Sequence, residues 1–83
     1  MTNSSFENDL KKVQEIFREI FLDDKLVITG KTSPLNIEEW DSLAHINILA
    51  AVESVFNVRF TADEMSSIND VEALLRAIAS RRM

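Results

Sequence analysis

The sequence predicts an all-α fold: a small four-helix bundle of three main helices and one short helix, with a long loop between the first and second helices. The chain of 83 residues has one Gly and one Pro, so few turns are enforced and most segments suit a helix. Apolar residues recur at steps of three or four over three segments, as in amphipathic helices. We expect a single domain over residues 1–83, because a chain this short forms one core.

The first helix is predicted to begin at a capping box and to end near Phe21. Ser4 and Glu7 have the spacing at which each side chain accepts from a backbone amide of the first turn. The apolar stripe of this helix consists of Phe6, Leu10, Val13, Phe17 and Ile20. Charged residues point in the other directions, so one face is expected to be buried.

A long loop is predicted from Leu22 to Trp40, where the helical periodicity is lost. Acidic, glycine and proline residues supply turn chemistry there. Residues 26–29 suit a strand, but the chain offers no second convincing strand to pair with them, so they are assigned to the loop. A loop this long in a small domain needs packing of its own. The residues expected to provide it are Leu26, Ile28, Leu35, Ile37 and Trp40.

The second helix is predicted to begin at Asp41 or Ser42, either of which can cap it, and to run to about Phe56. Its expected core stripe consists of Ile46, Leu49, Val52 and Phe56. The segment has the strongest helical pattern in the chain.

Two further caps predict the remaining helices. Thr61 and Glu64 form a capping box at the start of a short helix. Asn69 and Glu72 repeat the spacing, with Asn69 a weaker version of the cap, at the start of the last helix. The stripe of that helix consists of Val71, Leu74, Leu75 and Ile78.

Composition argues against several classes of function. Fourteen acids against nine Lys and Arg give a net charge of -5, which disfavours nucleic-acid binding and suits basic protein partners. Without cysteine, any thiol chemistry would come from an attached group. No apolar run reaches the length of a membrane span, and the first residues do not resemble a signal peptide, so we expect no membrane span and a cytoplasmic location.

Ser42 is the candidate site residue. It lies where the loop meets the second helix, and the amides and positive dipole end of a helix N-terminus stabilise a phosphate group. By its own chemistry Ser42 is also an ordinary helix cap, which is the commoner role of such a serine. The sequence that follows it favours the first role.

From Asp41 onward the chain resembles the acyl carrier protein family. The resemblance is densest at Asp41-Ser42-Leu43 and extends to Ile78, whereas the first helix and the loop resemble the family much less. The positions that carry it are Asp41, Ser42, Leu43, Ile46, Ile48, Leu49, Ala51, Val52, Glu53, Phe56, Phe60, Asp63, Glu64, Ile68 and Val71. The resemblance implies a right-handed bundle and a protein that is not an enzyme.

The family resemblance also implies a cofactor. A phosphopantetheinyl transferase would move phosphopantetheine from coenzyme A onto Ser42, next to Asp41 and Leu43. The chain would then hold acyl or aminoacyl groups as thioesters on the thiol of this arm. As a monomer, it would present them to acyl-transferring, condensing or acyl-activating enzymes in fatty acid, polyketide or related biosynthesis. Asp41 is equally suited to orient the transferase reaction or to cap the helix.

In the family, the positions matched by Leu43 and Ile46 contact partner enzymes, although both residues also suit core packing. Glu53, Trp40 and His45 are further candidates for partner binding. Trp40 is placed either to cover the arm or to pack the loop.

Two features depart from the pattern of fatty-acid-type carriers. Glu38-Glu39-Trp40 precedes the tripeptide where those carriers usually have a Gly, and the second helix has one acid, Glu53, where theirs is acid-rich. The acid-poor helix favours a specialised pathway. It also leaves Glu38, Glu39, Asp63 and Glu64 as candidates for an acidic rim, although solvated surface is the commoner role of such acids.

Two other functions remain open. A helical adaptor would bind a partner through the second helix without covalent modification, and a small hydrolase would use Asp41, Ser42 and His45 as a triad. The triad is disfavoured because its members lie within one helical turn and lack a separate orienting group. His45 is instead expected at the surface near the arm. A single His without Cys also gives no transition-metal site.

Overall fold

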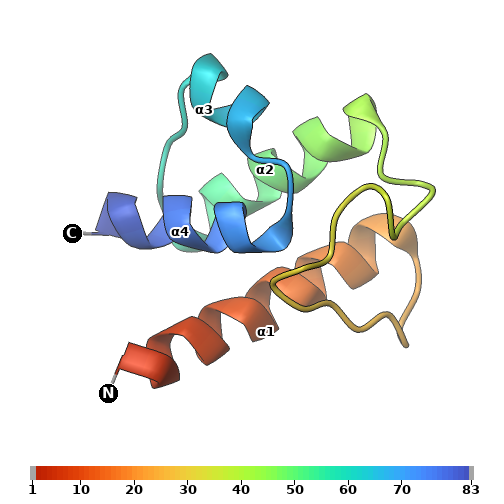
Figure 1. Cartoon of the computed structure of the whole chain (residues 1–83), viewed down its shortest axis with the longest axis horizontal. Coiled ribbons are helices and arrows are strands. Elements are labelled where there is room, and N and C mark those ends of the chain that lie inside the picture. The colour runs from red at the N-terminus through yellow and green to blue at the C-terminus, as the bar shows by residue number, and fades with distance from the viewer. Residues whose placement is uncertain (1, 83) are drawn as a thin grey trace.

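The structure is a computed structural model that describes the backbone of residues 2–82 and the side chains of residues 6–81. Within that range it contains four helices: α1 (Thr2–Phe21), α2 (Ser42–Phe56), α3 (Ala62–Ser67) and α4 (Val71–Arg82). α1 packs against α2 and α4, and the short α3 lies on the side of the bundle away from α1 (Figure 1). The predicted all-α class, with three main helices and one short one, is confirmed. None of the described helices is long and apolar enough to cross a membrane.

The core is built from the inner faces of α1, α2 and α4 together with parts of the loops. Its largest fully buried side chains are Phe17, Ile48, Leu49, Leu74, Leu75, Ile78, Val13, Val52 and Val71. The stripe predicted for the last helix is therefore confirmed. The prediction that Ile46 belongs to the core is wrong, because α2 buries Ala44, Ile48, Leu49 and Val52 and leaves Ile46 59% exposed.

Two of the predicted helix starts are wrong. α1 begins at Thr2, so Ser4 lies inside the helix and is not its cap; the side chain of Ser4 lies outside the described residues. α4 is capped by Asp70 rather than Asn69, since Asp70 Oδ1 accepts from the amide of Ala73 at 2.8 Å. One-residue shifts of this kind arise because Asn and Asp are about equally good caps.

The loop over residues 22–41 contains no strand and packs onto the core, as expected. Ile28, Ile37 and Trp40 are buried, and Leu26 is half-buried. Leu35 was expected to join them, but it is 97% exposed. It lies in a tight turn over residues 33–36, which is closed by two hydrogen bonds of 2.9 Å and directs its side chain outward.

Hydrogen bonds from two helices hold this loop in place. From α1, Gln14 Oε1 accepts from the amide of Ile28 at 3.0 Å, and Arg18 Nε donates to the carbonyl of Leu26 at 2.7 Å. At the other side, the carbonyls of Thr32 and Gly30 each accept at 2.9 Å from an amide in the first turn of α4. The loop therefore satisfies donors that a helix start leaves without partners. Its last residues, which lead into α2, are thereby fixed.

Candidate functional site

Ser42 is the first residue of α2, and it is exposed. The residue before it, Asp41, is the cap of the helix: its Oδ1 accepts from the amide of Ala44 at 2.9 Å, and its carbonyl accepts from the amide of His45 at 2.9 Å. Among the residues that the structure describes, the hydroxyl of Ser42 has no hydrogen-bond partner. Capping is thus performed by Asp41 and not by the Ser42 hydroxyl.

The backbone around Ser42 favours a negatively charged group. The amides of Ser42 and Leu43 lie in the first turn of α2, where no carbonyl of the same helix can accept from them. They lie at the positive end of the helix dipole, and the first turn of α2 contains no acidic residue. A phosphodiester on Ser42 would therefore be stabilised by the helix terminus rather than by a basic side chain.

A groove of about 460 Å³ opens beside Ser42. Three segments line it: the end of the long loop, the first two turns of α2, and α3 with the residues after it. The lining residues are Pro34, Trp40, Asp41, Ser42, His45, Ile46, Leu49, Met65, Ser66, Ile68 and Asn69. The sequence identified Ser42 and its helix, but it gave no indication that α3 forms the opposite wall.

Trp40 forms part of the floor of the groove. It is only 5% exposed, and its ring packs edge-on against Phe17 at a centroid distance of 5.2 Å. The indole Nε1 donates to His45 Nδ1 at 3.1 Å. Of its two predicted placements, Trp40 occupies the one that packs the loop, and it does so directly beside the candidate site.

His45 joins the two sides of the groove. Its Nε2 lies 2.9 Å from the carbonyl oxygen of Met65 in α3. Because an indole N–H can only donate, Nδ1 of His45 accepts in this pair, which leaves Nε2 to donate to the Met65 carbonyl. His45 lies at the surface of the groove beside Ser42, with its ring part-buried and both of its nitrogens engaged.

Leu43 and Ile46 flank Ser42 on the outer face of α2 and are 68% and 59% exposed. Large apolar side chains that remain in water next to a candidate site are typical of a surface that contacts other molecules. Their role in partner binding stays a prediction.

Comparison with known proteins identifies the family. No family model matches the chain, and no curated protein matches it. Among solved structures, the chain is similar to the solution NMR structure of a holo acyl carrier protein from Geobacter metallireducens, with a TM-score of 0.80 and 32% sequence identity. The match covers 88% of this chain and 84% of that chain. The chain belongs to the acyl carrier protein family. As the sequence predicted, it is a carrier and not an enzyme.

The hydrogen bonds of His45 argue against a catalytic triad of Asp41, Ser42 and His45. Since Nδ1 of His45 accepts from Trp40 and Nε2 faces the carbonyl of Met65, neither ring nitrogen is left to take a proton from Ser42. In the described part of the chain, no group of His, Cys, Asp and Glu side chains could hold a metal ion.

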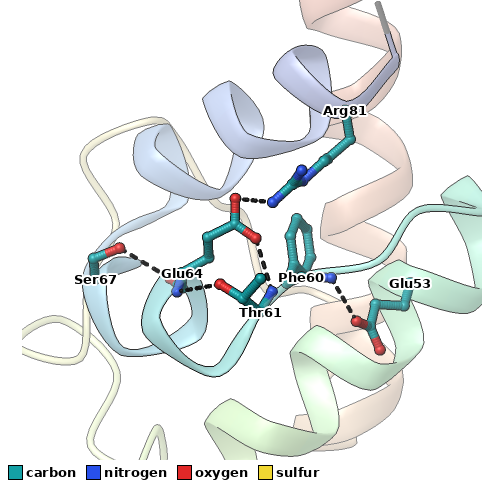
Figure 2. A network of polar contacts seen from close by, with 6 residues as sticks. All are labelled: Glu53, Phe60, Thr61, Glu64, Ser67 and Arg81. Atoms are coloured by element: carbon teal, nitrogen blue, oxygen red, sulfur yellow. Dashed lines mark hydrogen bonds and ion pairs between the residues drawn. The ribbon is translucent and has the colours of Figure 1, made fainter.

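Glu53, the one acid of α2, has an internal partner in this carrier. Its Oε2 accepts from the amide of Phe60 at 2.9 Å, which ties the end of α2 to the segment that leads into α3 (Figure 2). Glu53, Trp40 and His45 were all predicted to bind partners. That role stays a prediction, and the structure gives each of them a hydrogen bond within the chain.

The predicted capping box at the start of α3 is confirmed and extended. Thr61 Oγ1 accepts from the amide of Glu64 at 3.1 Å, and Glu64 Oε1 accepts from the amide of Thr61 at 2.7 Å. Figure 2 also shows Arg81 of α4 reaching the other oxygen of Glu64. The Arg81 guanidinium, and after it the amide of Thr61, lower the pKa of the Glu64 carboxyl below its ordinary value. Both oxygens of the Glu64 carboxylate thus have partners within the chain, which makes Glu64 a poor candidate for an acidic rim that binds other proteins.

Proposed function

We propose that this chain carries acyl groups as thioesters on a phosphopantetheine arm attached to Ser42. The observation that carries the proposal is the separation of two roles at the start of α2. Asp41 caps the helix, whereas the exposed hydroxyl of Ser42 forms no bond within the described part of the chain. The solved structure that the chain resembles is of a holo acyl carrier protein, which supports the same assignment.

The attachment is a transfer from coenzyme A. Oγ of Ser42 forms a bond to the phosphorus that bears the pantetheine, the pyrophosphate bond of coenzyme A breaks, and the nucleotide bisphosphate leaves. The hydroxyl proton passes to the phosphopantetheinyl transferase. The residues of this chain position the acceptor: Asp41 fixes the first turn of α2, and the amides of Ser42 and Leu43 face the new phosphodiester.

The arm supplies the thiol that the chain lacks. An acyl group held as a thioester on this thiol can be presented to acyl-transferring, condensing or acyl-activating enzymes. Leu43 and Ile46 are the exposed apolar contacts we assign to these partners. The one carboxylate of α2 is used internally by the Phe60 amide, and this favours a specialised pathway over general fatty acid synthesis.

Mass spectrometry tests the attachment site. After incubation with coenzyme A and a broad-specificity phosphopantetheinyl transferase, the intact wild-type chain should gain the mass of one phosphopantetheine. Ser42→Ala should gain none. Ser54→Ala removes an exposed hydroxyl from the same helix, away from the groove, and should be modified as fully as the wild type.

An unmodified wild-type chain, or an adduct that persists in Ser42→Ala, would overturn the proposal. The first result would leave a non-covalent adaptor as the best account of the fold. Ester hydrolysis that disappears with Ser42→Ala would indicate a hydrolase instead.

A further inference from the structure

The groove beside Ser42 is open to water on the outside and closed on the inside. Its floor is formed by Leu49, Ile68 and Trp40, which are 1%, 4% and 5% exposed. Close-packed interiors have few voids larger than a water molecule. An acyl chain carried on an arm attached to Ser42 can therefore enter the core through this groove only if part of the floor moves.

Trp40 is the largest part of the floor. Its indole lies between the groove and the fully buried Phe17, with the two ring planes at 90°. It also stacks on His45, with an interplanar angle of 26° and a centroid distance of 6.0 Å. Displacing the indole would disrupt both contacts and leave its N–H without the His45 acceptor.

His45 fixes the opposite wall. No residue within α3 is fully buried, and Met65 is the one side chain of this helix that packs, half-buried, against the core. At its start it is held by the capping box and Arg81, and near its end by the contact between His45 Nε2 and the Met65 carbonyl. The hydrogen-bonded series Trp40–His45–Met65, which we call the latch, therefore joins the loop, α2 and α3 across the groove.

The outer rim of the groove carries polar groups beside the exposed apolar side chain of Ile46. Ser66 and Asn69 are exposed there, beside the carbonyl of Met65. These polar groups can form hydrogen bonds with the amides of a pantetheine arm or with a polar acyl group. An alkyl chain can form no hydrogen bond with them.

We propose that the latch keeps acyl chains out of the core, so that this carrier holds its cargo in the open groove and is suited to short or polar acyl groups. The inference rests on the proposed function, because the cargo reaches the groove only through an arm on Ser42. It assigns Trp40 and His45 a role in cargo specificity.

The wild-type protein provides the first test. The chain is loaded by the transferase from acetyl coenzyme A and, separately, from octanoyl coenzyme A, and each adduct is verified by intact mass. The methyl NMR signals of Val52 and Leu75 report on the deep core, and those of Ile46 report on the groove. The acetyl and octanoyl forms should give the same Val52 and Leu75 shifts, with differences confined to the groove.

Variants test the latch itself. In octanoyl-loaded His45→Ala, the Val52 and Leu75 signals should shift away from those of the acetyl form, because α3 is released and the floor can open. A purely structural role of His45 would instead move the signals of both forms equally. Asn47→Ala, at an exposed position in the same helix, is the control and should behave like the wild type.

The outcomes separate the two proposals. Absence of an adduct would overturn the proposed function and this inference with it. An adduct whose octanoyl chain shifts Val52 or Leu75 in the wild type would leave the carrier function standing and overturn the latch. Unchanged deep-core signals in octanoyl-loaded His45→Ala would also overturn it.

Discussion

Asp41 and Ser42 are neighbours with similar capping ability, and the structure assigns them different tasks. The extended backbone of Asp41, with φ -98° and ψ -171°, directs its carboxylate back to the amide of Ala44. Ser42 is already inside the helix, where its side chain points to water. Modification of Ser42, as we propose it, would therefore leave the cap of α2 in place.

The division predicts unequal effects of two alanine substitutions on stability. Asp41→Ala should lower the free energy of unfolding by roughly 0.5–2 kcal/mol, because it removes the cap of α2. Ser42→Ala should cost clearly less. Asp41→Asn keeps an oxygen acceptor at the same position and should recover most of the loss. Urea unfolding followed by circular dichroism measures all three, and equal losses for Asp41→Ala and Ser42→Ala would contradict the assignment.

Ser42 could be found from the sequence, whereas the partners of His45 could not. The spacing of one helical turn placed His45 near Ser42, and that much is correct. Its hydrogen bonds depend on where the loop brings Trp40 and where α3 brings the carbonyl of Met65. Both are set by tertiary packing, and a backbone carbonyl has no signature in the sequence.

At the scale of elements, α3 is held mainly by polar contacts. None of its six residues is fully buried, although Met65 packs half-buried against the core, and the ends of the helix carry the capping box, the Arg81 ion pair and the contact to His45. Elements with few buried apolar contacts open at lower free energy than the core does. We therefore expect α3 to be the first helix to detach.

The Glu64–Arg81 pair should make stability depend on pH. Because its pKa is lowered in the folded state, Glu64 stabilises the fold above the ordinary carboxyl range, and this contribution is lost as the pH falls through that range. Glu64→Gln should therefore be less stable than the wild type at pH 7, and the difference should shrink toward pH 3. Urea unfolding across this range checks it. Asp63→Asn, at an exposed acid in the same helix, is the control. A difference that does not change with pH would contradict the pairing.

α3 was predictable from its capping box, and α4 was predictable from its apolar stripe although its cap is Asp70. The start of α1 was misplaced because nothing before Ser4 breaks a helix, so a capping motif alone did not stop the helix from extending to Thr2. Ile46 was misplaced because α2 is apolar on nearly every side. Periodicity cannot select the core face of such a helix. Of the large apolar side chains that α2 leaves exposed, Leu43 and Ile46 lie beside Ser42 and Val55 lies near the other end.

For the whole molecule, charge and apolar surface lie in different places. The net charge is -5, but the outer face of α2 beside Ser42 presents Leu43 and Ile46. The exposed acids near the site, Glu38 and Glu39, lie in the loop that leads into the helix. We expect charge to guide the approach of a basic enzyme, and apolar contacts to hold it afterwards.

This arrangement predicts a salt-dependent rate of modification. The second-order rate of phosphopantetheine transfer should fall as salt rises above about 0.1 M, where electrostatic interactions are screened beyond roughly 10 Å. Replacing Glu38 and Glu39 together by Gln should flatten the dependence. The same replacement at Glu7 and Glu19, exposed acids of α1, should affect it much less. Stopped reactions analysed by intact mass give the rates, and a rate independent of salt would exclude electrostatic guidance.

The carbonyls of Gly30 and Thr32 also affect how the chain folds. They accept from the first amides of α4, so two segments far apart in the sequence supply each other's hydrogen-bond partners. Helical domains usually fold quickly through local contacts. Here the amides of Val71 and Glu72 find their partners within the chain only once the long loop has docked. Docking of the long loop and docking of α4 therefore depend on each other. The loop that leads into Ser42 is held in place only when the last helix has also formed.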